Sequence, residues 1–267
     1  MKKTTYILLV LTMLLSTACE WKLKPQSEEE RPKVTVQRYD RIESLYLTTG
    51  DFSALQQMET DYPMETRTLL ENVLELGNVN DHEINNRFLA FFQNPKLQTI
   101  ISDAEAQYAN MDDINQQLEQ AFERLSQKVP GFPIPAIYAQ ITALDQSIII
   151  GDGTVGISLD KYLGQDYELY KEYYNDQQRA SMNRKNMVPD CISFYLISLY
   201  PLSDFETRTQ EERDLHMGKM MWVTNFAIGS RFFNTKYVKQ FDTYMQRHPN
   251  FSIENLLKMN DYTGMKL

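Results

Sequence analysis

Residues 151–156, Gly-Asp-Gly-Thr-Val-Gly, follow an apolar run and match G-x-G-x-x-G, the pattern of a turn that binds a dinucleotide pyrophosphate. Such a site needs the third glycine to lead into a helix, followed by a second parallel strand. Here Gly156 leads into Ile157-Ser-Leu-Asp160, which continues the alternation of a strand. We therefore predict a β-hairpin with Asp152 and Gly153 at its turn. No nucleotide is expected there, and no other cofactor is indicated.

The nearest approach to a metal site is residues 82–86, His-Glu-Ile-Asn-Asn, which begin like the zinc-binding pattern H-E-x-x-H. Asn86 stands where the second imidazole ligand must be, and Asp81 with the two residues after it is typical of a helix cap and first turn. His216 and His248 are expected on a solvated helical face and at a helix end. The sequence thus predicts no metal ligand and no catalytic residue, because no G-x-S-x-G or G-K-[ST] pattern occurs either.

Aromatic residues gather just after the expected hairpin, where Tyr162, Tyr167, Tyr170 and Tyr173 follow one another closely. Tyrosines can line a contact surface for a glycan or a peptide, because they offer area and a hydroxyl at low entropic cost. Packing in the core is the interpretation we favour, and a contact surface is the alternative. Asp160 lies where the expected strand gives way to a helix, so capping is its expected role.

The order of the helices and strands expected around these residues predicts one α+β domain over residues 34–267. A helical lobe is expected over about 34–130, and a sheet with the C-terminal helices over about 131–267. Apolar residues spaced by four and three predict a helix that begins near Asp112 and ends at Val129. Alternating β-branched residues predict three strands, at about 135–143, 146–150 and 155–160, in a small antiparallel sheet. Further helices are expected at 52–61 (capped by Asp51), 66–76 (ended by Gly77), after Asp81, after Asn94-Pro95, and at 189–200, 209–228, 235–247 and 252–260.

The N-terminus resembles a bacterial lipoprotein signal. Two lysines precede an apolar run at residues 6–15, and small residues lead to Cys19. Ser16 occupies the position where leucine is common in such signals. We expect residues 1–18 to be removed and Cys19 to be diacylated, with residues 19–33 as a polar tether. The lipid would anchor the protein in the bacterial cell envelope, as a periplasmic or outer-membrane protein.

The charge of the chain is acidic, with 27 Lys and Arg against 36 Asp and Glu and a formal net charge of −9. Removal of residues 1–18 takes away two lysines and no acids, which leaves a net charge of −11. Nucleic acid is therefore excluded as an expected partner, because phosphate backbones repel an acidic surface. Cys191 has no partner once Cys19 is acylated, so we expect no intramolecular disulfide and a buried, unreactive thiol.

Four segments in a fixed order resemble the GldB-like gliding-motility lipoprotein family. They are GFPIPAIYA (131–139), the hairpin continuing as VGISLDKYLGQD (155–166), MVPDCISFYLISLYPL (187–202) and LHMGKMMW (215–222). The resemblance covers residues 115–230 well, extends to the N-terminal helices only in layout, and ends after about Ile228.

The resemblance implies a lipidated envelope protein tied to gliding and its associated secretion machinery. It also implies a core similar to that of the zincin metalloproteases, here without a metal site. Together with the absent catalytic patterns, it favours a protein that acts through contacts with other envelope proteins. A hydrolase of peptide or glycan bonds is one alternative, because paired carboxylates leave no recognisable pattern. A glycan- or peptide-binding lipoprotein is the other.

Overall fold

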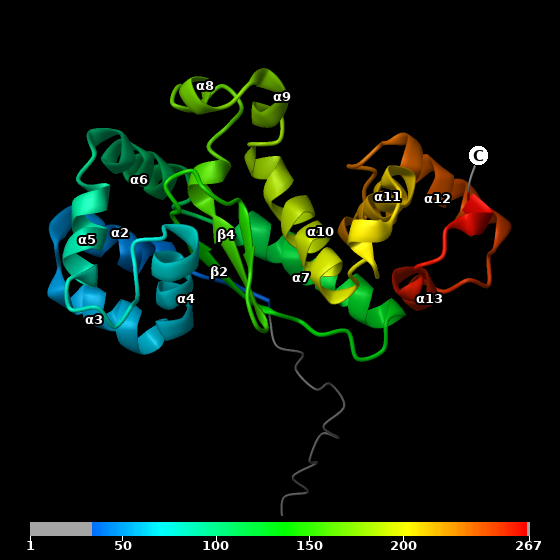
Figure 1. The fold of residues 1–267 in the computed structure, drawn as a ribbon, viewed down its shortest axis with the longest axis horizontal. Helices are drawn as coiled ribbons and strands as arrows, with labels where there is room; N and C mark the ends of the chain where they lie inside the picture. Colours follow the sequence, from blue (N-terminus) through cyan, green and yellow to red (C-terminus); the bar gives the residue numbers. More distant parts are fainter. Residues whose placement is uncertain (1–33, 266–267) are drawn as a thin grey trace, which may run out of the picture. The chain divides into compact units, whose positions relative to one another are not determined.

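The computed structural model describes residues 34–265, which cluster as one compact unit. The signal segment, Cys19 and the tether at 19–33 lie outside the described residues. The described range is α+β, with a small sheet among many helices (Figure 1). The fold class predicted from the sequence is therefore confirmed.

The N-terminal half of the described range is helical up to residue 128. Asp51 caps the second helix as predicted, because its Oδ1 accepts hydrogen bonds from the amides of Ser53 (2.7 Å) and Ala54 (3.4 Å). The helix expected at 66–76 begins and ends three residues earlier, since a five-residue helix from Pro63 passes into a π-helical turn that ends at Val73, before Gly77. The helices are α2 (Tyr39–Thr49), α3 (Phe52–Asp61), α4 (Pro63–Arg67), the π-helical turn Thr68–Val73, α5 (Ile84–Phe92), α6 (Pro95–Gln107) and α7 (Asp112–Lys128).

The sheet has four strands: β1 (Val36–Gln37), β2 (Ala136–Gln140), β3 (Ile148–Ile150) and β4 (Thr154–Ser158). Their order is β1-β2-β4-β3, with β1, β2 and β4 mutually parallel and β3 antiparallel to β4. The prediction of an antiparallel sheet was therefore wrong for β2 and β4. After β2 the chain skips the neighbouring position in the sheet and forms β3 one position further out. The hairpin then places β4 between β2 and β3. The two-residue β1 is too short to leave an alternation in the sequence.

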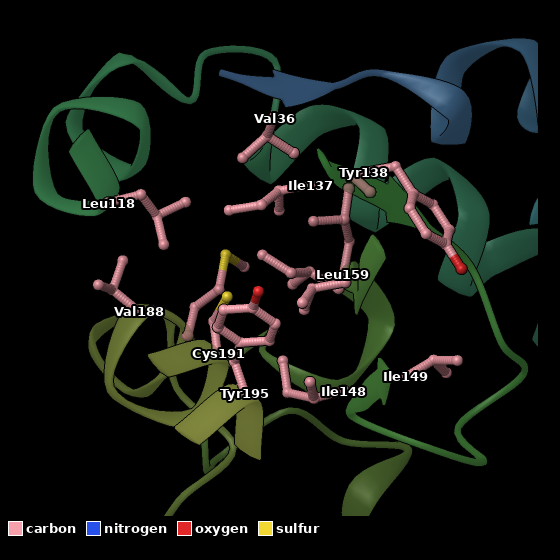
Figure 2. Packing of buried hydrophobic residues seen from close by; sticks show 14 of the residues in the cluster. Val36, Leu118, Ile137, Tyr138, Ile148, Ile149, Leu159, Val188, Cys191 and Tyr195 are labelled. Atoms are coloured by element: carbon pink, nitrogen blue, oxygen red, sulfur yellow. The ribbon is translucent and has the colours of Figure 1, made fainter. Parts of the chain in front are cut away.

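One face of the sheet packs against α10 (Met187–Leu199), and α7 contacts β1, where Oδ1 of Asn115 accepts a hydrogen bond from the amide of Val36 at 2.9 Å. Figure 2 shows Ile137 of the sheet facing Leu118 of α7, with Cys191 of α10 in the same cluster. Cys191 is fully buried, as the sequence predicted. The other face is covered by α2, whose Tyr39 ring lies edge-on to Tyr138, with centroids 6.2 Å apart.

The C-terminal helices pack on α7 and α10 through α11. They are α11 (Gln210–Ile228), α12 (Lys236–Arg247) and α13 (Ile253–Lys258), close to the predicted bounds. Two short helices, α8 (Tyr170–Tyr173) and α9 (Asp176–Arg179), lie between β4 and α10 in the chain. Figure 1 shows α2–α6 on one side of the strands and α11–α13 beyond α10.

Candidate functional site

The segment after β4 turns tightly at Leu159–Lys161, where Asp160 is fully buried. The Asp160 carboxylate accepts hydrogen bonds from the amides of Thr142 (3.1 Å) and Leu144 (2.6 Å). Ala143 and Leu144 have φ values of 52° and 68°, which non-glycine residues rarely adopt. Asp160 does accept backbone hydrogen bonds, as a capping residue does, but from this loop rather than from a following helix. It stabilises a strained connection between β2 and β3.

Lys161 holds the same loop from its other side. Its Nζ donates hydrogen bonds to the carbonyl oxygens of Leu144 and Asp145, both at 3.1 Å, and to the hydroxyl of Tyr174 at 2.9 Å. The ammonium also lies 4.5 Å from the centroid of the Tyr174 ring. All three of its protons are therefore directed at groups of the protein itself.

Tyr162 and Asp190 bring the second and third of the four sequence segments into contact. The Tyr162 ring is buried, and its hydroxyl donates a hydrogen bond to Oδ2 of Asp190 (3.0 Å) in the first turn of α10. Burial raises the pKa of the Asp190 carboxyl to about 7, although the hydrogen bond from Tyr162 lowers it. Asp190 therefore changes its charge near neutral pH, which is a property of many functional carboxyls.

A pocket of about 260 Å³ lies beside this pair. Polar groups and apolar carbon contribute about equally to its lining. The residues are Ser147, Lys161, Tyr162, Tyr174, Gln178, Ser181, Met182 and Asp190. Cys191 contributes no nucleophile here, since burial, together with the charge of Asp190, raises the pKa of its thiol to about 12. The pocket can accept hydrogen bonds from a small polar group and offers one titratable carboxyl.

The four tyrosines singled out in the sequence divide into buried and accessible side chains. Tyr162 and Tyr170 are buried, and the Tyr170 hydroxyl bonds to backbone atoms of Asp160 and Leu163. A contact surface is thus wrong for these two, whose side chains pack in the core. Tyr167 is half-buried and donates a hydrogen bond to Asp103 at 2.7 Å, whereas Tyr173 is 57% exposed. A contact role stays a prediction for Tyr173.

The predicted hairpin is confirmed, because β3 and β4 are antiparallel neighbours. Asp152 and Gly153 form its turn, closed by a hydrogen bond from the amide of Gly151 to the carbonyl of Thr154 (3.0 Å). Gly153 has a φ of +68°, a conformation that favours glycine. Gly156 lies within β4, so no helix follows the third glycine.

The fourth segment, at 215–222, contacts both α12 and the end of α13 through two particular residues, Gly218 and Lys219. A Cβ on Gly218 would lie 2.4 Å from Cβ of Tyr237, so glycine permits the close approach of α11 and α12. Lys219 is fully buried, and its Nζ donates hydrogen bonds to the carbonyl oxygens of Leu257 (3.0 Å) and Met259 (2.7 Å) at the end of α13. Sequence reasoning missed this contact, although a lysine inside an apolar run was a signal for it.

His216 lies one turn before this lysine and corrects a second expectation. It is buried rather than solvated, and its Nδ1 is 2.9 Å from the hydroxyl of Tyr262. Burial and the nearby Lys219 lower the pKa of the imidazole to about 4. The other candidate ligand, His82, is exposed, and Asp81 beside it accepts a hydrogen bond from the amide of Glu83 (3.0 Å).

Metal-ligating side chains do not gather in the described part of the chain. Between residues 34 and 265, no group of three or more His, Cys, Asp and Glu side chains is placed to hold a metal ion. Within the same range, no helix is both long and apolar enough to cross a bilayer.

The profile of the family described as gliding motility protein GldB matches residues 20–231. The chain belongs to this family. The match confirms the resemblance and extends it toward the N-terminus, over all of α2–α7. No curated protein and no solved structure matches the chain, so the zincin-like core stays a prediction.

In this member of the GldB family, all four segments lie inside the matched range. They form β2, β4 with its turn, α10 and the middle of α11. Their polar side chains meet at the small pocket and at the end of α13. The match ends at residue 231, so α12 and α13 lie beyond it.

Proposed function

We propose that this GldB-family protein is a lipidated component of the cell envelope that acts through protein contacts rather than by catalysis. One observation carries the proposal: three charged side chains of the family segments are engaged within the protein. The amides of loop 142–144 engage the carboxylate of Asp160, and backbone carbonyls engage the ammonium groups of Lys161 and Lys219. Residues used in this way define a rigid scaffold, which is what a contact protein needs.

The N-terminal sequence and the family support an envelope location. A diacylated Cys19 would hold the protein at a membrane surface of the envelope, periplasmic or outer-membrane. The tether at 19–33 is polar and contains prolines, so it would separate the folded domain from the lipid. Partners are then expected among other envelope proteins.

A second candidate function is favoured by Asp190. A carboxyl that titrates near pH 7 in a small pocket beside tyrosine and serine hydroxyls suits a hydrolase or a glycan- or peptide-binding protein. In this alternative, Asp190 would contact the ligand and Lys161 would position the loop that borders it.

The two candidates are separated by one pair of measurements on the purified mature protein. We expect it to capture a reproducible set of envelope proteins and to hydrolyse neither peptide nor glycan substrates. Asp190→Asn should capture the same set, because the carboxyl is not needed for contacts elsewhere. Hydrolysis that disappears in Asp190→Asn, or that accompanies stoichiometric zinc, would establish the alternative.

A further inference from the structure

The junction of α11 and α12 forms a groove outside the pocket already described. The linking segment 229–235 borders a pocket of about 490 Å³, and a second pocket of about 360 Å³ follows the exposed side of α12. Lys239 lines both pockets, so they adjoin along one helix. We call this surface the α12 groove. Its floor is apolar and aromatic, built from Trp222, Phe226 and Phe233.

The walls of the α12 groove are held in place by side-chain hydrogen bonds. The amide of Asn225 donates to the carbonyl of Phe233 (2.7 Å) and accepts from its N–H (2.9 Å), which fixes the linking segment to α11. The indole N–H of Trp222 donates to Oδ1 of Asp242 (2.8 Å), which fixes α11 to α12. A groove held in this way loses little conformational entropy when it is occupied.

The charge around the groove is opposite to that of the chain. Residues 231–248 contain four Lys and Arg and a single acid, Asp242, whereas the whole chain has a formal net charge of −9. Arg231 and Lys239 are exposed, and neither forms an ion pair with an acid in the described range. Asp242 already accepts the Trp222 hydrogen bond. Within the described residues, these two cations therefore have no acidic partner and lie beside an aromatic floor.

We propose that the α12 groove docks an acidic segment of a partner protein. An aromatic or aliphatic side chain of the partner would lie against Trp222 and Phe226, and its flanking carboxylates would meet Arg231 and Lys239. This inference rests on the proposed function, because it specifies the chemistry of a partner protein that the contact function requires. A membrane surface fits less well, because the aromatic rings are half-buried at the floor of a hollow and do not project as anchors in a bilayer do.

The test uses the full mature protein and a fluorescent peptide in which tryptophan is flanked on both sides by aspartate and glutamate. We expect binding that weakens with salt, since screening shortens the reach of the charges to about 8 Å at physiological ionic strength. Arg231→Glu with Lys239→Glu should weaken binding by about tenfold or more. The matched control is Lys128→Glu with Lys185→Glu, which reverses two exposed lysines outside the groove. It should stay within about twofold of the wild type.

A third variant, Phe226→Ala, tests the floor of the groove without changing charge. It should weaken the tryptophan peptide but not a peptide with alanine in place of tryptophan. Equal losses in the groove variant and the charge control would overturn the proposal, as would failure of the wild type to bind the peptide. Binding to phosphatidylglycerol vesicles alone, lost in the groove variant, would assign the groove to lipid instead.

Capture from envelope extracts separates failure of this inference from failure of the proposed function. If the wild type and the charge-reversed groove variant retain the same proteins, the groove is not the docking site, and the contact function stands. If the wild type captures nothing, the contact function itself fails. Melting curves of each variant verify folding, and Arg231→Gln with Lys239→Gln replaces the reversal if that variant unfolds.

Discussion

Asp160 is fully buried and Asp190 is half-buried at the edge of the small pocket, and their surroundings give them different roles. Burial raises the pKa of Asp160, while hydrogen bonds from the amides of Leu144 and Thr142 lower it. Those amides favour the ionised carboxylate that holds the strained loop. Asp190 accepts one hydrogen bond from Tyr162, and its pKa is raised to about 7. At the scale of single residues, one carboxyl fixes the backbone and the other responds to pH.

Asp190→Asn should stabilise the protein at pH 8 and have little effect near pH 4. Between about pH 4 and 7 the unfolded chain releases the Asp190 proton while the folded protein keeps it, so this group lowers stability as pH rises through that window. Asparagine avoids the buried charge and can still accept the Tyr162 hydrogen bond. We expect a gain of at most about 4 kcal/mol at pH 8, the value for a carboxyl whose pKa is raised from 3.8 to about 7, measured by urea unfolding. An equal change at both pH values would contradict this assignment.

At the scale of elements, the sequence patterns predicted individual helices and strands better than they predicted how the strands pair. The spacing of Ile114, Leu118 and Leu125 predicted α7, and all three are buried. The parallel pairing of β2 with β4 was missed, because it depends on the strained loop after β2. The amides of Thr142 and Leu144 in this loop are held by a carboxylate 16 to 18 residues further along the chain. No periodicity records such a contact.

The hairpin offers a test of which of its features matter most. Gly153→Val should cost about 1–3 kcal/mol, because valine is strained at a φ of +68°. Ile157→Lys should cost more, since Ile157 is fully buried in β4 and its replacement places a charge in the core. Thermal unfolding measures both. A larger loss in Gly153→Val, or a nucleotide-induced rise in melting temperature that this variant abolishes, would reverse our interpretation of the glycine pattern.

At the scale of the whole molecule, the candidate sites join residues distant in the chain. Tyr162 meets Asp190 across 28 residues, and Lys219 meets Met259 across 40. The sequence identified the segments that carry Tyr162, Asp190 and Lys219, but not their contacts. A polar side chain is buried only where a hydrogen-bond partner is available, and these partners lie far away in the sequence. The α12 groove was missed for a similar reason: its cations and aromatic rings come together only where two helices cross.

The attachment of the molecule to the envelope is expected to depend on Cys19. Cys19→Ser removes the acceptor of the lipid, and each buried CH₂ of an acyl chain contributes about 0.8 kcal/mol to membrane binding. This variant should lose incorporation of labelled palmitate and leave the membrane fraction. The matched control is Cys191→Ser, which changes the other thiol of the chain, buried in α10, and should leave both readouts unchanged. If Cys19→Ser stays with membranes through high-salt and carbonate washes, the lipid is not what holds the protein there.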